Sequence, residues 1–189
     1  MEKGKIILIN GVSSAGKTTL SQTLQQRFAE QYFLIPGDIV NDISPPKNSS
    51  SYNLRFTADP KPVMSSVFGC AKAFADNGLN VIVETIFTTD SHFALDNFLS
   101  VFPNDNYPIL FALLTCPLEE LRRREKERGD RQIGWGESLL AKLDPPNTYD
   151  IIIDTYNSTK EECADEIIRL ANSSERFMAF KTLWQQRCI

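Results

Sequence analysis

The feature that most constrains the fold lies near the start of the chain, where residues 11–18 read Gly-Val-Ser-Ser-Ala-Gly-Lys-Thr. This stretch fits G-x-x-x-x-G-K-[ST], the pattern of a loop whose backbone N–H groups cradle phosphate oxygens. Gly11 and Gly16 permit the close approach and the unusual dihedral angles that such a loop needs. Lys17 supplies a positive charge for the outer phosphates, and the Thr18 hydroxyl is placed to ligate Mg²⁺.

The flanking sequence supplies the elements that this loop requires. Residues 5–10 form a short apolar run, which is typical of a buried parallel strand. Beyond the loop, Leu20, Leu24 and Phe28 recur with helical spacing. This strand–loop–helix order disfavours the alternative, a Gly/Ser-rich turn without a ligand. We therefore predict nucleotide-binding residues at Gly11, Val12, Ser13, Ser14, Ala15, Gly16, Lys17, Thr18 and Thr19.

Length and composition narrow the class of protein. A chain of 189 residues is most simply one domain, residues 1–189, with a full core. Its net charge of -4 argues against a non-specific nucleic-acid surface. No apolar run approaches a membrane span, and the four cysteines are scattered without metal-binding spacing. We expect a cytoplasmic protein with reduced thiols and no membrane partner, and the sequence leaves its oligomeric state open.

Apolar runs and helical patterns alternate along the chain. The predicted strands are residues 5–10, 32–36, 79–83, 109–115 and 149–154. Helical patterns at 63–77, 118–128, 137–143, 159–171 and 174–187 lie between or after them. This alternation predicts an α/β fold, specifically a P-loop NTPase three-layer sandwich with a five-stranded parallel sheet.

Two acids occur where predicted strands end. Asp38 follows the strand at 32–36, and in an open parallel sheet that position faces the ligand crevice. Asp is also a common helix N-cap, so its position leaves a capping role and a catalytic role equally open. Glu84 follows the strand at 79–83, where P-loop proteins keep a second metal-site residue, usually Asp. We predict that Thr18 and Glu84 form the Mg²⁺ site.

The segment at 44–62 contains four prolines, which exclude a regular helix. A loop of this length in a compact domain is usually functional or disordered. We interpret it as a loop that covers the substrate, and a floppy insertion is the alternative.

Five of the ten arginines fall between positions 122 and 131. Arg124, Arg128 and Arg131 have i, i+4, i+7 spacing and share one helical face. Charge runs are usually solvated faces with i, i+4 ion pairs. Beside a P-loop, an Arg-rich helical lid over about 118–143 is favoured, since guanidinium groups stabilise charge on transferring phosphates.

These pieces resemble the chloramphenicol phosphotransferases, which are P-loop kinases that use ATP to phosphorylate a hydroxyl of an antibiotic. Besides the loop, the resemblance rests on Gly37-Asp38, Val81-Ile82-Val83-Glu84, Cys116-Pro117-Leu118-Glu119 and the Arg124-Glu125-x-x-Arg128-Gly129-Asp130-Arg131 segment. It implies ATP and Mg²⁺ as cofactors and Asp38 as the base that accepts the hydroxyl proton. It also implies that Lys17, Arg124, Arg128 and Arg131 contact phosphates. One departure is Glu84-Thr85, where the family has an acidic pair.

The expected function is therefore an ATP-dependent O-phosphotransferase for a small molecule, and the resemblance implies antibiotic resistance. A kinase of the same fold for a metabolite (a nucleoside, shikimate-like or adenylylsulfate-like acceptor) is one alternative. A nucleotide-binding regulatory module that is not a kinase is the other. A guanine-reading N/T-K-x-D motif is absent from the sequence, which disfavours a GTPase.

Overall fold

A computed structural model places five strands in one parallel sheet in the order β2-β3-β1-β4-β5. The structure describes residues 2–43, 61–89, 93–102, 106–129, 134–143, 149–173 and 177–187. The strands are β1 (Ile6–Asn10), β2 (Tyr32–Ile35), β3 (Asn80–Thr85), β4 (Ile109–Thr115) and β5 (Ile151–Asp154). Because β1 is central, the loop that follows it opens in the middle of the carboxyl edge of the sheet.

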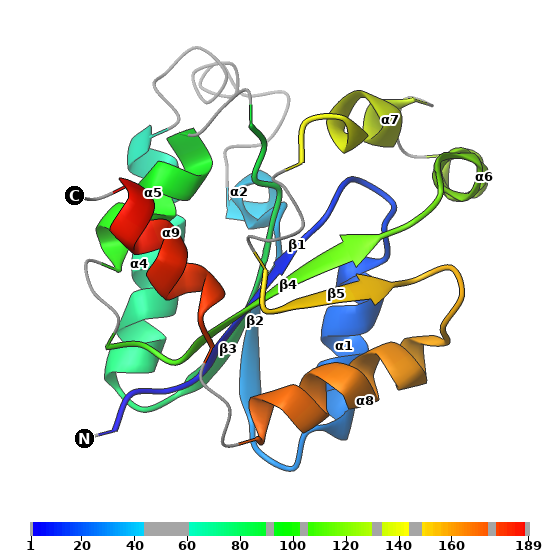
Figure 1. Cartoon of the computed structure of the whole chain (residues 1–189). Coiled ribbons are helices and arrows are strands. Elements are labelled where there is room, and N and C mark those ends of the chain that lie inside the picture. The colour runs from blue at the N-terminus through cyan, green and yellow to red at the C-terminus, as the bar shows by residue number, and fades with distance from the viewer. Residues whose placement is uncertain are drawn as a thin grey trace.

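Helices cover both faces of this sheet and complete three layers (Figure 1). One face carries α1 (Lys17–Arg27) and α8 (Lys160–Ala171), and the other carries α4 (Lys61–Asp76), α5 (Phe93–Val101) and α9 (Ala179–Arg187). Alternation along β1 divides the core, since Ile7 and Ile9 join the first layer whereas Ile6 and Leu8 join the second. The predicted α/β sandwich with a five-stranded parallel sheet is confirmed.

Within the described ranges, three further helices lie at the carboxyl ends of the strands: α2 (Ile39–Ile43), α6 (Leu118–Arg128) and α7 (Trp135–Leu140). The chain passes from β1 to β2, returns to β3 beside β1, and then crosses to β4 on the opposite side. Ligands of open parallel sheets bind at such a switch point. None of the helices in the described ranges is long and apolar enough to cross a membrane.

Several element boundaries differ from the sequence prediction. Strand β3 continues to Thr85, so Glu84 lies within the strand and pairs in register with Ile9. Helix α4 begins at Lys61, which ends the predicted loop two residues early, because the first turn of a helix tolerates Pro62. The remainder of that predicted loop, residues 44–60, lies outside the described residues.

The second half of the chain shows similar shifts. Strand β5 begins at Ile151, and α7 spans Trp135–Leu140 where the sequence predicts a helix at 137–143. Helix α9 begins at Ala179, although the sequence predicts a start at 174. The Asp150 carboxylate accepts hydrogen bonds from the Met178 N–H at 2.7 Å and the Ala179 N–H at 2.9 Å. This cap from a distant residue fixes where α9 starts.

Candidate active site

Two apolar side chains anchor the loop between β1 and α1 to the core. The side chains of Val12 and Ala15 are buried in the core. Ser14 and Gly16 have left-handed backbone conformations, with φ of 63° and 96°. Left-handed φ is unfavourable for a non-glycine residue such as Ser14, and such outliers gather at ligand sites. The buried anchors and these dihedral angles bend the backbone into the concave form that suits a phosphate.

Lys17 is held at the mouth of this loop. Its Nζ donates to the Gly11 carbonyl at 2.7 Å and to the Val12 carbonyl at 2.9 Å. The two bonds keep the ammonium group at the loop while its side chain lines the cavity that also contains Asp38.

Thr18 and Glu84 meet although 66 positions separate them in the chain, because β3 lies beside β1. The Thr18 hydroxyl donates to Glu84 Oε2 at 3.0 Å. Glu84 is only 5% exposed, and its Oε1 has no hydrogen-bond partner among the described residues. A buried carboxylate oxygen beside a hydroxyl is a donor set that suits Mg²⁺, which takes few protein ligands besides phosphate and water. The two residues therefore fit the predicted metal.

A cavity of about 630 Å³ opens beside the loop, and we call it the Asp38 cavity. Asp38 and Lys17 both contribute to its wall. Its other lining residues are Ser14, Thr18, Pro36, Gly37, Ile39, Val40, Met64, Val67, Phe68, Glu84, Thr85, Ile86, Arg128 and Trp135. Most of the wall away from the loop is apolar and comes from α2, α4 and α7.

A smaller cavity of about 280 Å³ lies on the other side of the loop, and we call it the Arg124 cavity. It is lined by Ser14, Gly16, Thr18, Thr19, Leu20, Arg124, Arg128, Thr155, Ser158, Lys160 and Cys163. Ser14, Thr18 and Arg128 line both cavities. The two cavities therefore meet along the phosphate-binding loop.

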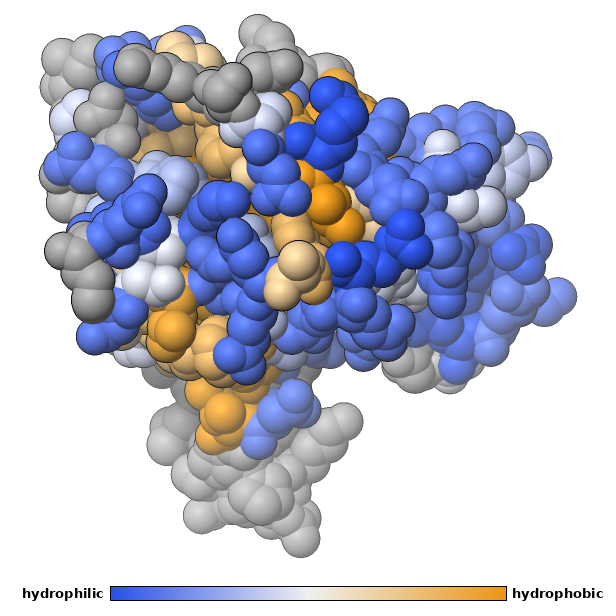
Figure 2. All heavy atoms as spheres, turned by 90° about the horizontal axis from the view of Figure 1, so that it is seen from below, coloured by the Kyte–Doolittle hydropathy of each residue, from blue (hydrophilic) through white to orange (hydrophobic). Residues whose placement is uncertain are grey.

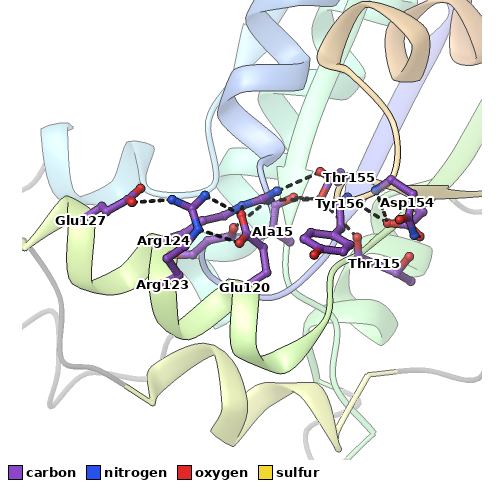
Figure 3. Close-up of polar contacts among 11 residues, drawn as sticks. Ala15, Thr115, Glu120, Arg123, Arg124, Glu127, Asp154, Thr155 and Tyr156 are labelled. Carbon is purple, nitrogen blue, oxygen red and sulfur yellow. Dashed lines mark hydrogen bonds and ion pairs between the residues drawn. The ribbon is translucent and has the colours of Figure 1, made fainter.

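Thr155 joins β5, α6 and the loop (Figure 3). Its Oγ1 donates to the Ala15 carbonyl at 2.9 Å. Arg124 reaches the same threonine, with Nη1 donating to Oγ1 at 3.2 Å and Nη2 donating to the carbonyl oxygen at 2.8 Å. Arg124 Nη1 also lies 3.4 Å from the Ser14 carbonyl oxygen. Arg124 is thus fixed against the loop.

The neighbouring arginine behaves differently. Arg123 forms ion pairs with Glu120 and Glu127 on the outer surface of α6 (Figure 3). Hydrogen bonds from Arg123 and then from Arg124 lower the pKa of Glu120 to about 2. The solvated-helix interpretation therefore describes Arg123. Arg124 also forms an i, i+4 ion pair with Glu120, but it contacts the loop as well, and Arg124 and Arg128 line the site. Arg131 lies outside the described residues.

The sequence predictions gave Thr155 and its neighbour Asp154 no role in the site, although Asp154-Thr155 also matches the family pattern. The Asp154 carboxylate accepts from the Tyr156 N–H at 2.8 Å and from the Asn157 side chain at 2.6 Å. The Tyr156 N–H is the main cause of a lowered Asp154 pKa. Both residues sit at the carboxyl end of a strand, so the rule that singled out Asp38 could have found them.

A third cavity, of about 550 Å³, lies at the opposite edge of the sheet and includes Lys5, Tyr107 and Phe180. The underside of the molecule carries apolar surface in patches between hydrophilic side chains (Figure 2). Because open parallel sheets bind ligands at the carboxyl ends of their strands, the cavities beside the loop are the candidate site.

Comparison with known proteins agrees with this geometry. The sequence pattern of the family described as "chloramphenicol phosphotransferase-like protein" matches residues 4–172. The chain belongs to this family. A relative from Mycobacterium tuberculosis, named "putative O-phosphotransferase", is 31% identical over 204 aligned positions that cover 97% of this chain and 89% of the relative. An adenylyl-sulfate kinase from Clostridium acetobutylicum is 25% identical over 182 positions, covering 88% of this chain and 82% of the kinase.

Solved structures share the fold of this phosphotransferase-like chain. The Mycobacterium tuberculosis APS kinase in complex with AMPPNP and APS has a TM-score of 0.65 at 18% identity and covers 92% of this chain and 100% of its own. The Acinetobacter baumannii shikimate kinase in complex with shikimate has a TM-score of 0.60 at 16% identity, with 92% and 97% coverage. With its family and relatives, the chain is a P-loop kinase with a nucleotide-binding loop.

Proposed function

We propose that this kinase transfers the γ-phosphoryl group of ATP to a hydroxyl group of a small molecule bound in the Asp38 cavity. The observation that carries the proposal is that Asp38 and Lys17 line one cavity, which meets the Arg124 cavity along the phosphate-binding loop. A donor on one side of the loop and an acceptor on the other would bring the reacting oxygen and phosphorus together.

On the donor side, the loop backbone and Lys17 bind the outer phosphates, and the nucleoside extends into the Arg124 cavity. Arg124 and Arg128, joined by Arg131, stabilise the charge that spreads over the phosphoryl oxygens. Thr18 and Glu84 would hold Mg²⁺, which when bound would neutralise phosphate charge. The protein contributes mainly by positioning these groups, because phosphoryl transfer needs little covalent chemistry from side chains.

On the acceptor side, Asp38 accepts a hydrogen bond from the attacking hydroxyl and orients its oxygen. The new O–P bond forms as the bond to the leaving ADP oxygen breaks, and the hydroxyl proton passes to the Asp38 carboxylate. A carboxylate is a weak base, but it suffices when the proton leaves late, as a loose transition state permits.

The walls of the Asp38 cavity favour an uncharged acceptor. Ile39, Met64 and Phe68 supply apolar surface away from the loop. Among the described residues of the lining, the cations are Lys17 and Arg128, and both face the phosphates in this proposal. An anionic acceptor would need further cations in the pocket to offset its desolvation. The described part of the wall therefore favours an uncharged hydroxyl compound such as chloramphenicol over shikimate-like or adenylylsulfate-like acceptors.

The test is a panel of acceptors incubated with ATP, Mg²⁺ and the protein and examined by mass spectrometry. The panel includes chloramphenicol and other uncharged hydroxyl compounds, and shikimate, adenylyl-sulfate and nucleosides as the metabolite arm. We expect one added phosphoryl group on an uncharged member. Phosphorylation confined to anionic members would contradict the acceptor class, and a product from no member would contradict the proposed function.

A further inference from the structure

A buried carboxylate joins the two helices beside the site. Glu125 lies on α6, and its residue is only 1% exposed. Its Oε2 accepts from the Gly134 N–H at 2.7 Å, and its Oε1 accepts from the Gly136 N–H at 2.6 Å. Both N–H groups belong to the amino-terminal end of α7, where helix donors lack partners within the helix. The Glu125 side chain therefore caps the helix that follows its own.

This end of α7 also packs directly on the phosphate-binding loop. A Cβ atom added at Gly136 would lie 3.0 Å from Glu125 Oε1 and 3.0 Å from the Ser13 carbonyl oxygen. The missing side chain allows α7 to approach both groups. Since Arg124, the residue before Glu125, contacts the Ser14 carbonyl, adjacent positions of α6 attach to the loop and to α7.

The other end of α7 is attached to the acceptor side. Thr88 and Leu143 form an antiparallel bridge, and the Thr89 N–H donates to the Lys142 carbonyl at 2.6 Å. The segment of residues 134–143 is thus tied to the phosphate-binding loop at one end and to the chain beyond β3 at the other. Figure 1 shows α7 beside α6 at the carboxyl edge of the sheet.

Trp135 is the first residue of α7 and lies between Gly134 and Gly136, whose N–H groups donate to Glu125. Its side chain lines the Asp38 cavity and remains 52% exposed. We propose that Glu125 is a positioning residue that holds α7 across this cavity, so that Trp135 binds the apolar body of the acceptor and contributes to its selection. This inference rests on the proposed function and adds to it a residue that selects the substrate. An aromatic ring at the wall favours an acceptor that can stack or pack on it.

The first test needs neither ATP nor an acceptor. Glu125→Gln keeps the size of the side chain but turns an amide NH₂ toward one backbone donor, so one of the two hydrogen bonds is lost. Hydrogen exchange at the Gly134 and Gly136 amides should become at least about tenfold faster. Glu127→Gln makes the same chemical change at an exposed site on the same helix and should leave both rates unchanged. Equal exchange rates at these two amides in the two variants would refute the capping of α7 by Glu125.

The second test separates positioning from general damage. For chloramphenicol, or for the member of the acceptor panel that the wild type phosphorylates, Glu125→Gln and Trp135→Ala should each raise the acceptor KM about tenfold. The KM for ATP should stay within about twofold of its wild-type value, because the loop contacts of Arg124 are unchanged. Trp184→Ala, which removes the other tryptophan from α9, should change neither constant.

The outcomes separate this inference from the proposed function. If the wild type transfers phosphate but neither variant changes the acceptor KM, the role of α7 is refuted and the proposed function stands. An equal rise in both KM values would show that Glu125 supports only the loop. If the wild type transfers to no acceptor, the proposed function and the acceptor role of Trp135 both fail, and the exchange rates still decide whether Glu125 holds α7.

Discussion

The two sides of the phosphate-binding loop differ in how their residues are distributed along the sequence. On the nucleotide side, the phosphate-binding loop is one short stretch, residues 11–18, whose carbonyl groups accept hydrogen bonds from Thr155 and Arg124. The acceptor side consists of side chains from α2, α4, β3 and α7, which are distant in the sequence. The geometry of phosphate binding is therefore set locally, whereas the acceptor pocket can change with the helices around it. This difference explains how one scaffold accommodates different acceptors.

The largest effect is expected from a substitution on the nucleotide side. Lys17→Ala removes the charge at the mouth of the loop, and kcat/KM should fall by about 10³-fold or more with every acceptor. Steady-state kinetics measure the loss, and circular dichroism should report an unchanged fold. Lys126→Ala, which removes an exposed cation from α6, serves as the control and should retain activity. Turnover by Lys17→Ala close to that of the wild type would remove Lys17 from the mechanism.

The next largest effect is expected from a substitution that changes only the acceptor side. Asp38→Asn should lower kcat by about 10²- to 10⁴-fold, because the amide cannot accept the hydroxyl proton. ATP affinity, measured by calorimetry, should be unchanged because Asp38 lines only the acceptor cavity. Asp96→Asn, an exposed change on α5, should behave as wild type. Loss of ATP binding in Asp38→Asn would contradict the division between the two sides.

A smaller effect tests the support of the loop. Thr155→Val keeps the shape of the side chain but removes the hydroxyl that donates to Ala15 and accepts from Arg124. We expect a loss of about 1–3 kcal/mol in the free energy of unfolding and a rise of about tenfold in the KM for ATP. The acceptor KM should not change. Thr182→Val, on the exposed side of α9, is the matched control. An unchanged KM for ATP would show that Thr155 does not position the loop.

The smallest effect concerns acid stability. The arginine hydrogen bonds lower the pKa of Glu120 from 4.5 to about 2. A carboxyl whose pKa is lowered on folding stabilises the native state above its unfolded pKa, and this stabilisation is lost as the pH falls toward the folded pKa. Urea unfolding should therefore show a stability difference between wild type and Glu120→Gln that is full above about pH 4.5 and shrinks toward about pH 2. A difference independent of pH would contradict this assignment.

The nucleotide side could be predicted from the sequence because its information is local. A strand, a glycine loop and a helix within 22 residues, 6–27, fix the site of Lys17 and Thr18. The contact of Glu84 with Thr18 could also be predicted, because it needs only the rule that the ends of parallel strands meet at one edge of a sheet.

The contacts that position α6 and α7 could not be predicted in this way. In the sequence, Glu125 looks like one more acid in a charged helix. Its role as a buried cap of α7 becomes visible only in the structure, where Gly136 lies close to its carboxylate. Arg123 and Arg124 are adjacent in the sequence and both pair with Glu120, yet Arg124 also contacts the loop. Such roles depend on contacts between distant segments, which periodicity and spacing do not encode.

The most direct test of the account follows the terminal phosphate. ATP labelled at its γ-phosphorus is incubated with Mg²⁺, the wild-type protein and the uncharged hydroxyl acceptors, and the label is followed into each product. We expect the label to enter an organic phosphate at a rate that depends on the acceptor, and we expect Asp38→Asn to slow this transfer by about 10²- to 10⁴-fold. Label that appears only as inorganic phosphate, at a rate which no acceptor changes, would contradict the account and indicate a nucleotide-hydrolysing regulator.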